Sequence, residues 1–244
     1  MNALIPLLKL DEVVECRIVE RTSRFTLTVE VGDKRETAYT NNTGRLRNYI
    51  VPGRTGYCLE SKRGKLKLRI VGVEDGEYAA LIDTRLQEES LLAAWRYGLV
   101  YWLTNCTLYK RNYRLDNVVV DFAFKCNNGD LRLVEVKSAV MKISESVAGY
   151  PDAPTARGRR QLIKLAEYAA SGGSAYVVFI AGIPLARKFK LYCGEDKEIK
   201  RCVEVAASSG VVFKAINLFL DSHSRTVVLG GVDIPVDLSC ESES

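Results

Sequence analysis

Two side chains of opposite charge lie within an otherwise apolar stretch, DLRLVEVKSAV, at residues 130–140. The stretch is typical of a β-strand, whose successive side chains point to opposite faces. Glu135 and Lys137 therefore point to the same face of the strand. A carboxylate and an ammonium group placed in this way could serve a site that handles phosphodiesters.

The preceding strand, VVVDFAF, carries a second carboxylate at Asp121 and is joined to the first stretch by KCNNGD. A two-residue loop at Asn128-Gly129 would place Asp121 opposite Val136, so that Asp121 and Glu135 faced opposite ways. A three-residue loop ending at Gly129 would place Asp121 directly opposite Glu135. The sequence favours the second loop, because a type I turn followed by a left-handed residue favours glycine in that last position.

Two opposed carboxylates, with Cβ atoms about 4.5–5.5 Å apart, raise each other's pKa unless a cation lies between them. Asp121 and Glu135, with water and a backbone carbonyl, would form an oxygen site suited to Mg²⁺ or Mn²⁺. Lys137, roughly 7 Å along the same face, could position a water molecule or stabilise charge on a phosphate. The alternative is a surface strand on which Glu135 and Lys137 are solvated or paired with each other, and both interpretations stay open.

The 244-residue chain contains no apolar stretch near the roughly 20 residues that cross a bilayer. Its start, MNALIPLLKLDEVV, lacks the features of a secretion signal, so a cytoplasmic protein with no membrane partner is expected. The seven cysteines include no CxxC pair, which argues against zinc and favours buried thiols, and one or two disulfides would fit a hyperthermophilic source. With one histidine, His223, catalysis would depend on carboxylates, lysine and a metal.

The net charge of +5 is unevenly distributed along the chain. Residues 1–83 hold 14 Lys/Arg and 12 Asp/Glu, and residues 171–244 hold 8 and 9. Residues 84–170 hold 13 and 9, so the basic excess is largest in the section that contains both strands. Such an excess is compatible with a polyanionic partner, although many proteins with a similar surplus bind none.

Residues 10 to about 83 contain short strand-like segments separated by turns, which predicts a five-stranded OB-type barrel in a domain spanning residues 1–83. One of its strands, within KRGKLKLRI, carries basic residues on a face that is either solvated or part of a nucleic-acid groove. These residues are Arg63, Lys65, Lys67 and Arg69. A helix near residues 84–98 and then strands alternating with helices near 156–170 and 195–207 predict an α/β domain over residues 84–244.

The predicted helix ARGRRQLIKLAEYAA has Thr155 as its N-cap and an apolar stripe along one side. Arg157, Gln161 and Lys164 fall on another face, and Arg160 adds charge near the N-terminus. A basic helix N-terminus attracts phosphate through its charge and its free amides. A solvated basic helix is the alternative.

Asp121, Glu135 and Lys137 across a hairpin resemble the motif of the PD-(D/E)xK nuclease superfamily. Asp116 competes for the aspartate role, but an odd number of positions separates it from Asp121, which puts it on the other face of a regular strand. Further segments resemble, in the right order along most of the chain, the sugar fermentation stimulation protein A (SfsA) family. These segments are NNTGRL at 41–46, VPG at 51–53, VDF at 120–122, VEVKS at 134–138 and YPDAPTARG at 150–158.

The resemblance implies an N-terminal OB-like domain, a PD-(D/E)xK nuclease-like domain, and DNA binding with a role in regulating sugar (maltose) metabolism. It also implies that Glu89 is a weaker candidate for a helical acid that assists the site, and that Asn42, Thr43 and Arg45 of NNTGRL contact nucleic acid. The chain departs from the family at Gln161, where His is frequent, and at position 41, where Pro is frequent. Because glutamine does not shuttle protons near neutral pH, a mechanism that needs a base at 161 is in doubt.

The leading hypothesis is therefore a DNA-binding or nucleic-acid-binding protein with a Mg²⁺-dependent phosphodiesterase site, in which Arg157 holds a phosphate. The alternative is a DNA-binding regulator whose nuclease-like fold does not cut. A direct role in carbohydrate chemistry is supported by no sugar-site motif in the sequence. DNA is the expected partner, and the sequence leaves RNA, a homodimer and turnover itself open.

Overall fold

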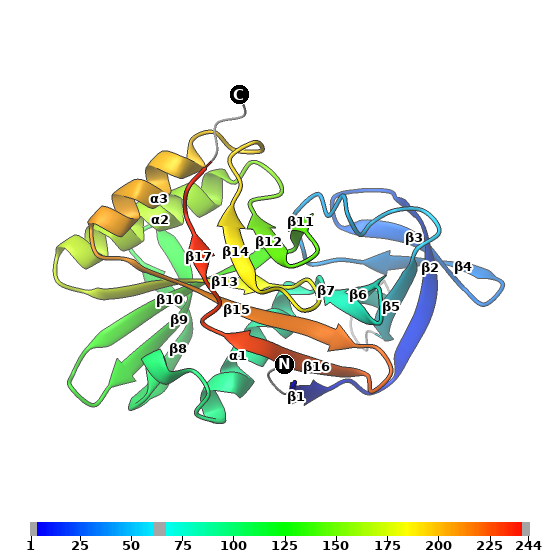
Figure 1. Ribbon diagram of the computed structural model, residues 1–244, viewed down its shortest axis with the longest axis horizontal. Coiled ribbons are helices and arrows are strands. Elements are labelled where there is room, and N and C mark those ends of the chain that lie inside the picture. Colours follow the sequence, from blue (N-terminus) through cyan, green and yellow to red (C-terminus); the bar gives the residue numbers. More distant parts are fainter. Residues whose placement is uncertain (1–3, 61–66, 241–244) are drawn as a thin grey trace.

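The computed structural model describes residues 4–60 and 67–240, with a barrel at one end and a mixed α/β domain at the other (Figure 1). The helices are α1 (Thr84–Arg96), α2 (Ala156–Ala170), α3 (Ile199–Ser208) and the short 3-10 helix η1 (Tyr101–Leu103). The strands are β1 (Ile5–Lys9), β2 (Val13–Arg21), β3 (Thr26–Val31), β4 (Lys34–Tyr39), β5 (Thr55–Glu60), β6 (Leu68–Asp75), β7 (Tyr78–Leu81), β8 (Cys106–Leu115), β9 (Val118–Cys126), β10 (Leu131–Ala139), β11 (Met141–Ser144), β12 (Val147–Tyr150), β13 (Ser174–Ala181), β14 (Lys188–Leu191), β15 (Val212–Asp221), β16 (Thr226–Val232) and β17 (Val236–Asp237).

Strands β2 to β6 form the N-terminal barrel. They follow the antiparallel order β4-β3-β2-β5-β6, and parallel pairing of β4 with β6 closes the ring at Ala38–Leu68. Side chains that alternate along these strands, such as Ile18, Leu27 and Ile70, are buried in its interior. The five-stranded OB-type barrel predicted from the sequence is confirmed.

The second domain is built on a mixed sheet that β10, β13 and β15 cross in parallel, with β9 and β8 added by antiparallel pairing. Helices α2 and α3 lie side by side over one face of this sheet (Figure 1). Phe179 of β13 packs in the core under α2 and α3, whereas its neighbour Ile180 packs in the core that contains α1. From Val177 to Ala181 β13 is buried on both faces, and this part of its sequence is entirely apolar, as is typical of parallel strands.

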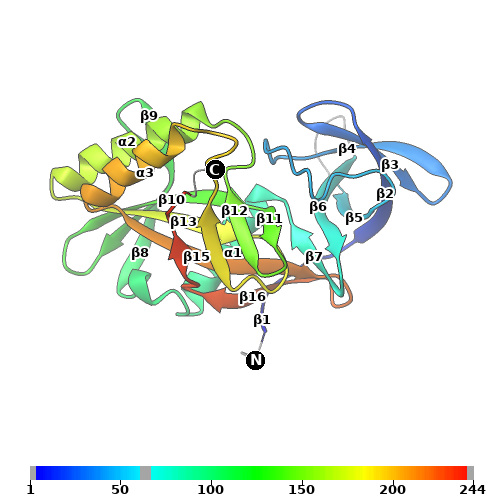
Figure 2. The same ribbon diagram turned by 45° about the horizontal axis from the view of Figure 1, so that its top comes forward.

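A smaller sheet, in the order β11-β12-β14-β17, lies between the helices and the barrel (Figure 2). Its strand β12 leads directly into the loop that starts α2. The small sheet therefore places the segment YPDAPTARG between the barrel and the rest of the second domain.

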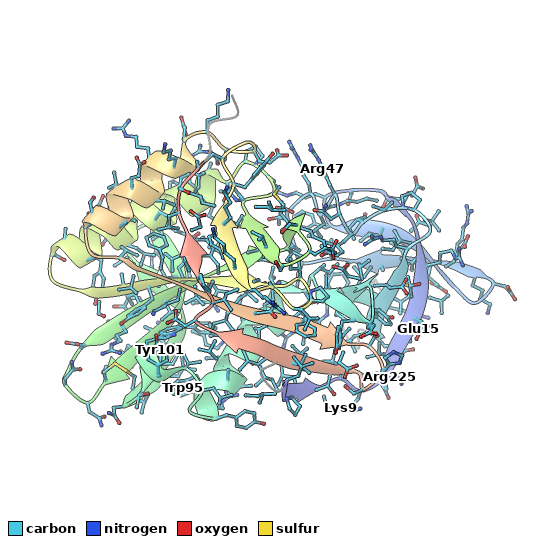
Figure 3. All side chains as sticks on the ribbon, in the orientation of Figure 1. Lys9, Glu15, Arg47, Trp95, Tyr101 and Arg225 are labelled. Carbon is cyan, nitrogen blue, oxygen red and sulfur yellow. A yellow bond between two sulfur atoms is a disulfide. The ribbon has the colours of Figure 1, made fainter. Side chains whose placement is uncertain are left out.

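Two strands connect the domains. Strand β7 pairs with β6 of the barrel and with β15 of the second domain, so one sheet runs through both. Strand β1 pairs with β16, and Lys9 and Arg225 lie where they meet (Figure 3). The sequence predicts residues 1–83 as one domain, but β1 lies on the sheet of the second domain because its apolar residues complete the core beneath α1.

Two disulfides link described cysteines, Cys106–Cys126 and Cys193–Cys240. The first joins directly opposed residues of β8 and β9. The sequence alone did not decide whether any cysteines form disulfides. No helix within residues 4–60 and 67–240 is long and apolar enough to cross a membrane.

The hairpin of β9 and β10 has the predicted register. Leu131 pairs with Lys125 and Val134 pairs with Phe122, which is the register of a three-residue loop at residues 127–129. The three-residue loop predicted from the sequence is thus confirmed, and the paired ladder ends one step before positions 121 and 135.

Gly129 accounts for that register. Its amide donates to the carbonyl of Cys126 at 2.9 Å, and the amide of Cys126 donates to the carbonyl of Asp130 at 2.9 Å. Its φ of 88° lies in the left-handed region that favours glycine. A three-residue loop is the result.

The substitution Gly129→Ala is expected to lower the free energy of unfolding by about 1–2 kcal/mol, because a side chain disfavours the left-handed conformation. Urea unfolding measures the change. Asn127→Ala in the same loop is the matched control and should stay within about 0.5 kcal/mol of the wild type, since Asn127 is exposed and contributes a backbone bond that alanine keeps. Equal losses in both variants would contradict the role given to Gly129.

Candidate functional site

The ladder between β9 and β10 ends just where the charged residues begin. Its last backbone pair is Val134–Phe122. One step further, the carboxylate Oδ2 of Asp121 accepts a hydrogen bond from the amide of Val136 at 2.7 Å. A side chain thus replaces the next backbone partner, so β9 and β10 stay connected without continuing as paired strands.

Gln161 of α2 connects the two strands beyond this point. Its Nε2 donates to the carbonyl of Val119 on β9 at 2.8 Å, and its Oε1 accepts from Nζ of Lys137 on β10 at 2.7 Å. Gln161 is 3% exposed, so both of its polar ends are satisfied inside the protein. The helix predicted at residues 156–170 is confirmed, and its phase brings Gln161 to the site.

Lys137 and Glu135 form a buried ion pair. Nζ of Lys137 lies 2.8 Å from Oε1 of Glu135, and the two residues are 7% and 3% exposed. The second carboxylate oxygen of Glu135, Oε2, has no hydrogen-bond partner among the described residues. An unsatisfied buried polar atom costs about 1–3 kcal/mol, more when charged, so folding alone does not account for this arrangement.

Three carboxylates share the electrostatic environment of this pair. Burial raises the pKa of Glu135 to about 7; the ammonium of Lys137 opposes the rise, and the carboxylate of Asp121 adds to it. Burial also raises the pKa of Asp121, and burial together with Asp121 raises the pKa of Glu88 to about 7. Burial lowers the pKa of Lys137, but Glu135 and other nearby groups outweigh that effect and raise it, so the ammonium stays charged.

Glu88, rather than Glu89, is the helical acid that lines the site cavity. Asp83 caps α1 by accepting from the amide of Leu86 at 2.7 Å, which fixes the phase of the helix. Glu89 pairs with Arg111 at 2.5 Å on the side of α1, and Glu88 reaches the same guanidinium at 3.2 Å. Sequence reasoning missed Glu88, because the two acids are adjacent and only the orientation of the helix separates them.

The acids open into a cavity of about 630 Å³ between the two domains. This volume lies within the range of about 300–1,000 Å³ typical of ligand sites. The α/β domain contributes Asp121, Glu135, Lys137, Gln161 and Arg157, together with the loop at 150–158. The barrel contributes residues 24–25 and 41–44, so both domains line the site.

The loop NNTGRL connects the barrel to the second domain. Asn42 is buried and donates to the carbonyl of Ile82 at 3.0 Å and to Oγ of Ser138 at 3.1 Å, while its Oδ1 accepts from the amide of Gly44 at 2.9 Å. Its neighbour Thr43 is exposed and lines the cavity. Asn42 therefore positions the loop, and Thr43 is the residue of the pair that a ligand can reach.

Asp152 holds the other side of the same loop. Its Oδ2 accepts from the amide of Leu46 at 2.9 Å. A Cβ at Gly44 would lie 2.3 Å from Oδ1 of Asp152, so glycine allows this close approach. The bonds from Asn42 and Asp152 fix the loop against the second domain.

The other basic candidates are more dispersed. Arg157 lines the cavity, and neither Arg157 nor Arg160 has a hydrogen-bond or ion-pair partner within the described part of the chain. Arg160 and Lys164 line a separate groove of about 320 Å³ on α2. Arg45 pairs with Glu195 and, like the exposed Lys67, lies outside the cavity lining.

The predicted groove residues Arg63 and Lys65 lie outside the residues that the structure describes. Arg69, predicted on the same basic face, pairs with buried Asp83 at 3.3 Å. The proposal of a nucleic-acid groove on that strand therefore draws no support from Arg69.

The fold and this site define a protein in which an OB barrel is joined to a mixed α/β, restriction-endonuclease-like domain. The model of the SfsA N-terminal OB domain matches residues 19–82, and the model of the sugar fermentation stimulation protein RE domain matches residues 85–224. The chain belongs to the sugar fermentation stimulation protein (SfsA) family, as the sequence motifs indicate.

Relatives match over most of their length. The sugar fermentation stimulation protein homologue of Pyrococcus furiosus is 33% identical over 94% of this chain and 99% of its own. The homologue of Archaeoglobus fulgidus is 38% identical over 87% of this chain and 91% of its own. The solved structure of Pyrococcus furiosus SfsA in complex with Ca²⁺ is similar with a TM-score of 0.91, at 33% identity, over 96% of this chain and 99% of that one.

Asn42→Ala is expected to lower the free energy of unfolding by about 1–3 kcal/mol, because it leaves the partners of a buried amide unsatisfied. Thermal or urea unfolding measures the loss. Thr43→Ala is the matched control at the next position and should change stability by less than about 0.5 kcal/mol, since Thr43 is exposed. A neutral Asn42→Ala would show that the loop is held by Asp152 alone.

Proposed function

We propose that this protein is a nucleic-acid-binding phosphodiesterase that depends on a divalent cation, with DNA as its first candidate substrate. The observation that carries the proposal is the pair Asp121 and Glu135 on facing strands, open to one cavity, with the Lys137 ammonium beside them. A buried acid and a buried amine, with a second, partly buried acid close by, are costly to fold and chemically useful. The domain matched to an RE domain supports a reaction at phosphodiesters.

The residues present fit a hard cation such as Mg²⁺ or Mn²⁺. Glu135 has a free oxygen, Oε2, and Asp121 uses Oδ2 for Val136, which leaves its Oδ1. Within residues 4–60 and 67–240 no three His, Cys, Asp or Glu side chains form a ligand group. Mg²⁺ needs no such group, because it is usually held by one or two carboxylates with water and substrate phosphate. The Ca²⁺ complex of the Pyrococcus furiosus relative supports a divalent cation here.

A bound cation would supply positive charge to neutralise the phosphate and to acidify a nearby water. The chain's own residues do the rest. Lys137 uses two donors on Glu135 and Gln161, which leaves its third for a water or a phosphate oxygen. Arg157, unpaired within the described ranges, holds the phosphate, and Gln161 orients the amine without moving protons.

The alternative is a DNA-binding regulator of sugar (maltose) metabolism that keeps the nuclease-like fold without cutting. One observation favours it: Lys137 and Glu135 already neutralise each other at 2.8 Å, so the pair could be a structural unit. The unsatisfied oxygen of Glu135 argues for the enzyme instead.

Metal binding is tested by thermal unfolding without any substrate. Mg²⁺ or Mn²⁺ at about 100 times its Kd should stabilise the protein by about 2.7 kcal/mol. For a chain of this size that corresponds to a rise in Tm of roughly 5–10 °C. Asp121→Asn and Glu135→Gln should lose the rise, because each removes an anionic ligand. Glu204→Gln should keep it, because Glu204 is an exposed residue of α3. An equal rise in all three variants would place the metal elsewhere.

Cleavage is tested with labelled DNA and RNA, single- and double-stranded, in Mg²⁺, Mn²⁺ or EDTA. The wild type should cut with metal and be inactive in EDTA. Glu135→Ala and Lys137→Ala should each lose at least about 100-fold in rate, the scale seen when a group that stabilises the transition state is removed.

Glu135→Ala leaves the buried ammonium of Lys137 without its carboxylate partner, which can cost about 3–5 kcal/mol of stability. Glu135→Gln is included for this reason. An inactive but stably folded Glu135→Gln supports the enzyme, and Glu204→Ala should remain fully active. Salt-sensitive binding with no cutting by the wild type would favour the regulator. A protein that binds no nucleic acid would overturn both functions.

A further inference from the structure

A large apolar side chain stands exposed at the edge of the cavity. Phe25 lies in the loop before β3, is 51% exposed, and lines the same cavity as Asp121 and Glu135. An exposed aromatic ring rimmed by polar groups is typical of a binding surface.

The loop that carries Phe25 is held in place by its own bonds. Thr22 and Ser23 donate their amides to the carbonyl of Thr26 at 3.0 and 3.2 Å, and the amide of Phe25 donates to Oγ of Ser23 at 3.2 Å. The ring is therefore presented to the cavity by a fixed backbone.

Arg21 connects this loop to the second loop of the barrel wall. Its guanidinium donates to the carbonyls of Ser23 and Arg24 at 3.2 and 2.7 Å, and to those of Gly44 and Arg45 at 2.7 and 2.8 Å. One side chain thus sets the position of Phe25 relative to the loop that is anchored on the second domain.

Positive charge flanks the ring on both walls. The guanidinium of Arg24 lies 5.8 Å from the centroid of the Phe25 ring and has no carboxylate partner in the described residues. Arg157 lines the opposite, α/β side of the cavity. An exposed aromatic ring with one arginine beside it and another in the same cavity suits an unpaired base together with its phosphates.

This combination discriminates between paired and unpaired nucleic acid. In a duplex the base faces are stacked on each other, so a ring on a cavity wall has no free face to contact. Glu135 is also buried, at 3% exposure, so the phosphate must enter the cavity to reach it. A single strand can do both.

We infer that this cavity takes a single-stranded segment of nucleic acid, with one base stacked on Phe25 and its phosphates between Arg24 and Arg157. The inference rests on the proposed function and names its substrate class. Arg160 and Lys164 continue the face of α2 that Arg157 begins, three and seven residues on, and line the adjacent groove of about 320 Å³. The strand leaves the cavity along that groove.

The test compares oligonucleotides of one sequence as a single strand, as a blunt duplex, and as a duplex with a single-stranded overhang. Binding is measured by fluorescence anisotropy in EDTA. The wild type should bind the single strand and the overhang at least about tenfold more tightly than the blunt duplex. Phe25→Ala should weaken single-strand binding roughly 5- to 150-fold, the range for one stacked base, and leave duplex binding unchanged.

Phe25→Trp tests stacking directly, because it keeps an aromatic ring and adds a fluorophore at the rim. It should retain single-strand affinity, and single-stranded DNA should quench its emission more than the blunt duplex does. Tyr97→Ala is the matched control, since Tyr97 is an exposed aromatic outside the cavity lining, and it should change nothing.

The outcomes separate this inference from the function on which it rests. Metal-dependent cutting that treats strand and duplex alike, with Phe25→Ala unaffected, overturns the inference and leaves the phosphodiesterase standing. Phe25-dependent binding of single strands without any cutting supports the stacking surface and overturns the phosphodiesterase. Tight duplex binding that depends on Phe25 would overturn single-strand selectivity and point to a flipped base.

Discussion

The hydrogen bond from the amide of Val136 to the carboxylate of Asp121 is the constraint on which the site depends. The backbone ladder between β9 and β10 ends at this hydrogen bond. The two strand ends do not fray, because the bond still holds them at a fixed separation. Gln161 then spans the two strands from α2, bonded to Val119 on one side and Lys137 on the other. Had the ladder continued, backbone partners would have taken the place of Gln161, and Lys137 would have lost its second partner. A local departure from sheet pairing therefore generates the whole charged constellation.

The charges at the site carry an energetic cost that their partners in the fold offset only in part. Glu135 has one oxygen satisfied by Lys137 and one unsatisfied, and burial together with Asp121 raises its pKa to about 7. Glu88 is raised to the same value, again by burial first and then by Asp121. A protein selected for stability alone would replace such groups with apolar ones. Under the proposed function, the charge of a bound cation would offset part of this cost.

Local signals in the sequence predicted what local physics decides. The left-handed requirement at Gly129 fixed the hairpin register, and the Thr155 cap fixed α2 to the residue. The features that the sequence did not predict depend on contacts between residues far apart along the chain. Glu88 and Glu89 are equally acidic, and the packing of α1 selects between them. The exposed strand β8 shows little apolar alternation, and β1 is defined by its pairing with β16. Phe25 carried no signal, because sequence does not reveal that a phenylalanine stays exposed.

The barrel is part of the site rather than an attached binding module. Asn42 and Asp152 hold one barrel loop on the second domain. Arg21 donates hydrogen bonds to that loop and to the loop of Phe25, and so fixes the two loops relative to each other. The barrel loops that line the cavity are thus held in place by hydrogen bonds. Because each contact uses a buried or directed polar group, the two domains cannot shift relative to each other without breaking several bonds. Any ligand that reaches Glu135 in this cavity therefore also meets residues of the barrel, because residues 24–25 and 41–44 line the same cavity. Both domains thus determine which shapes the cavity accepts.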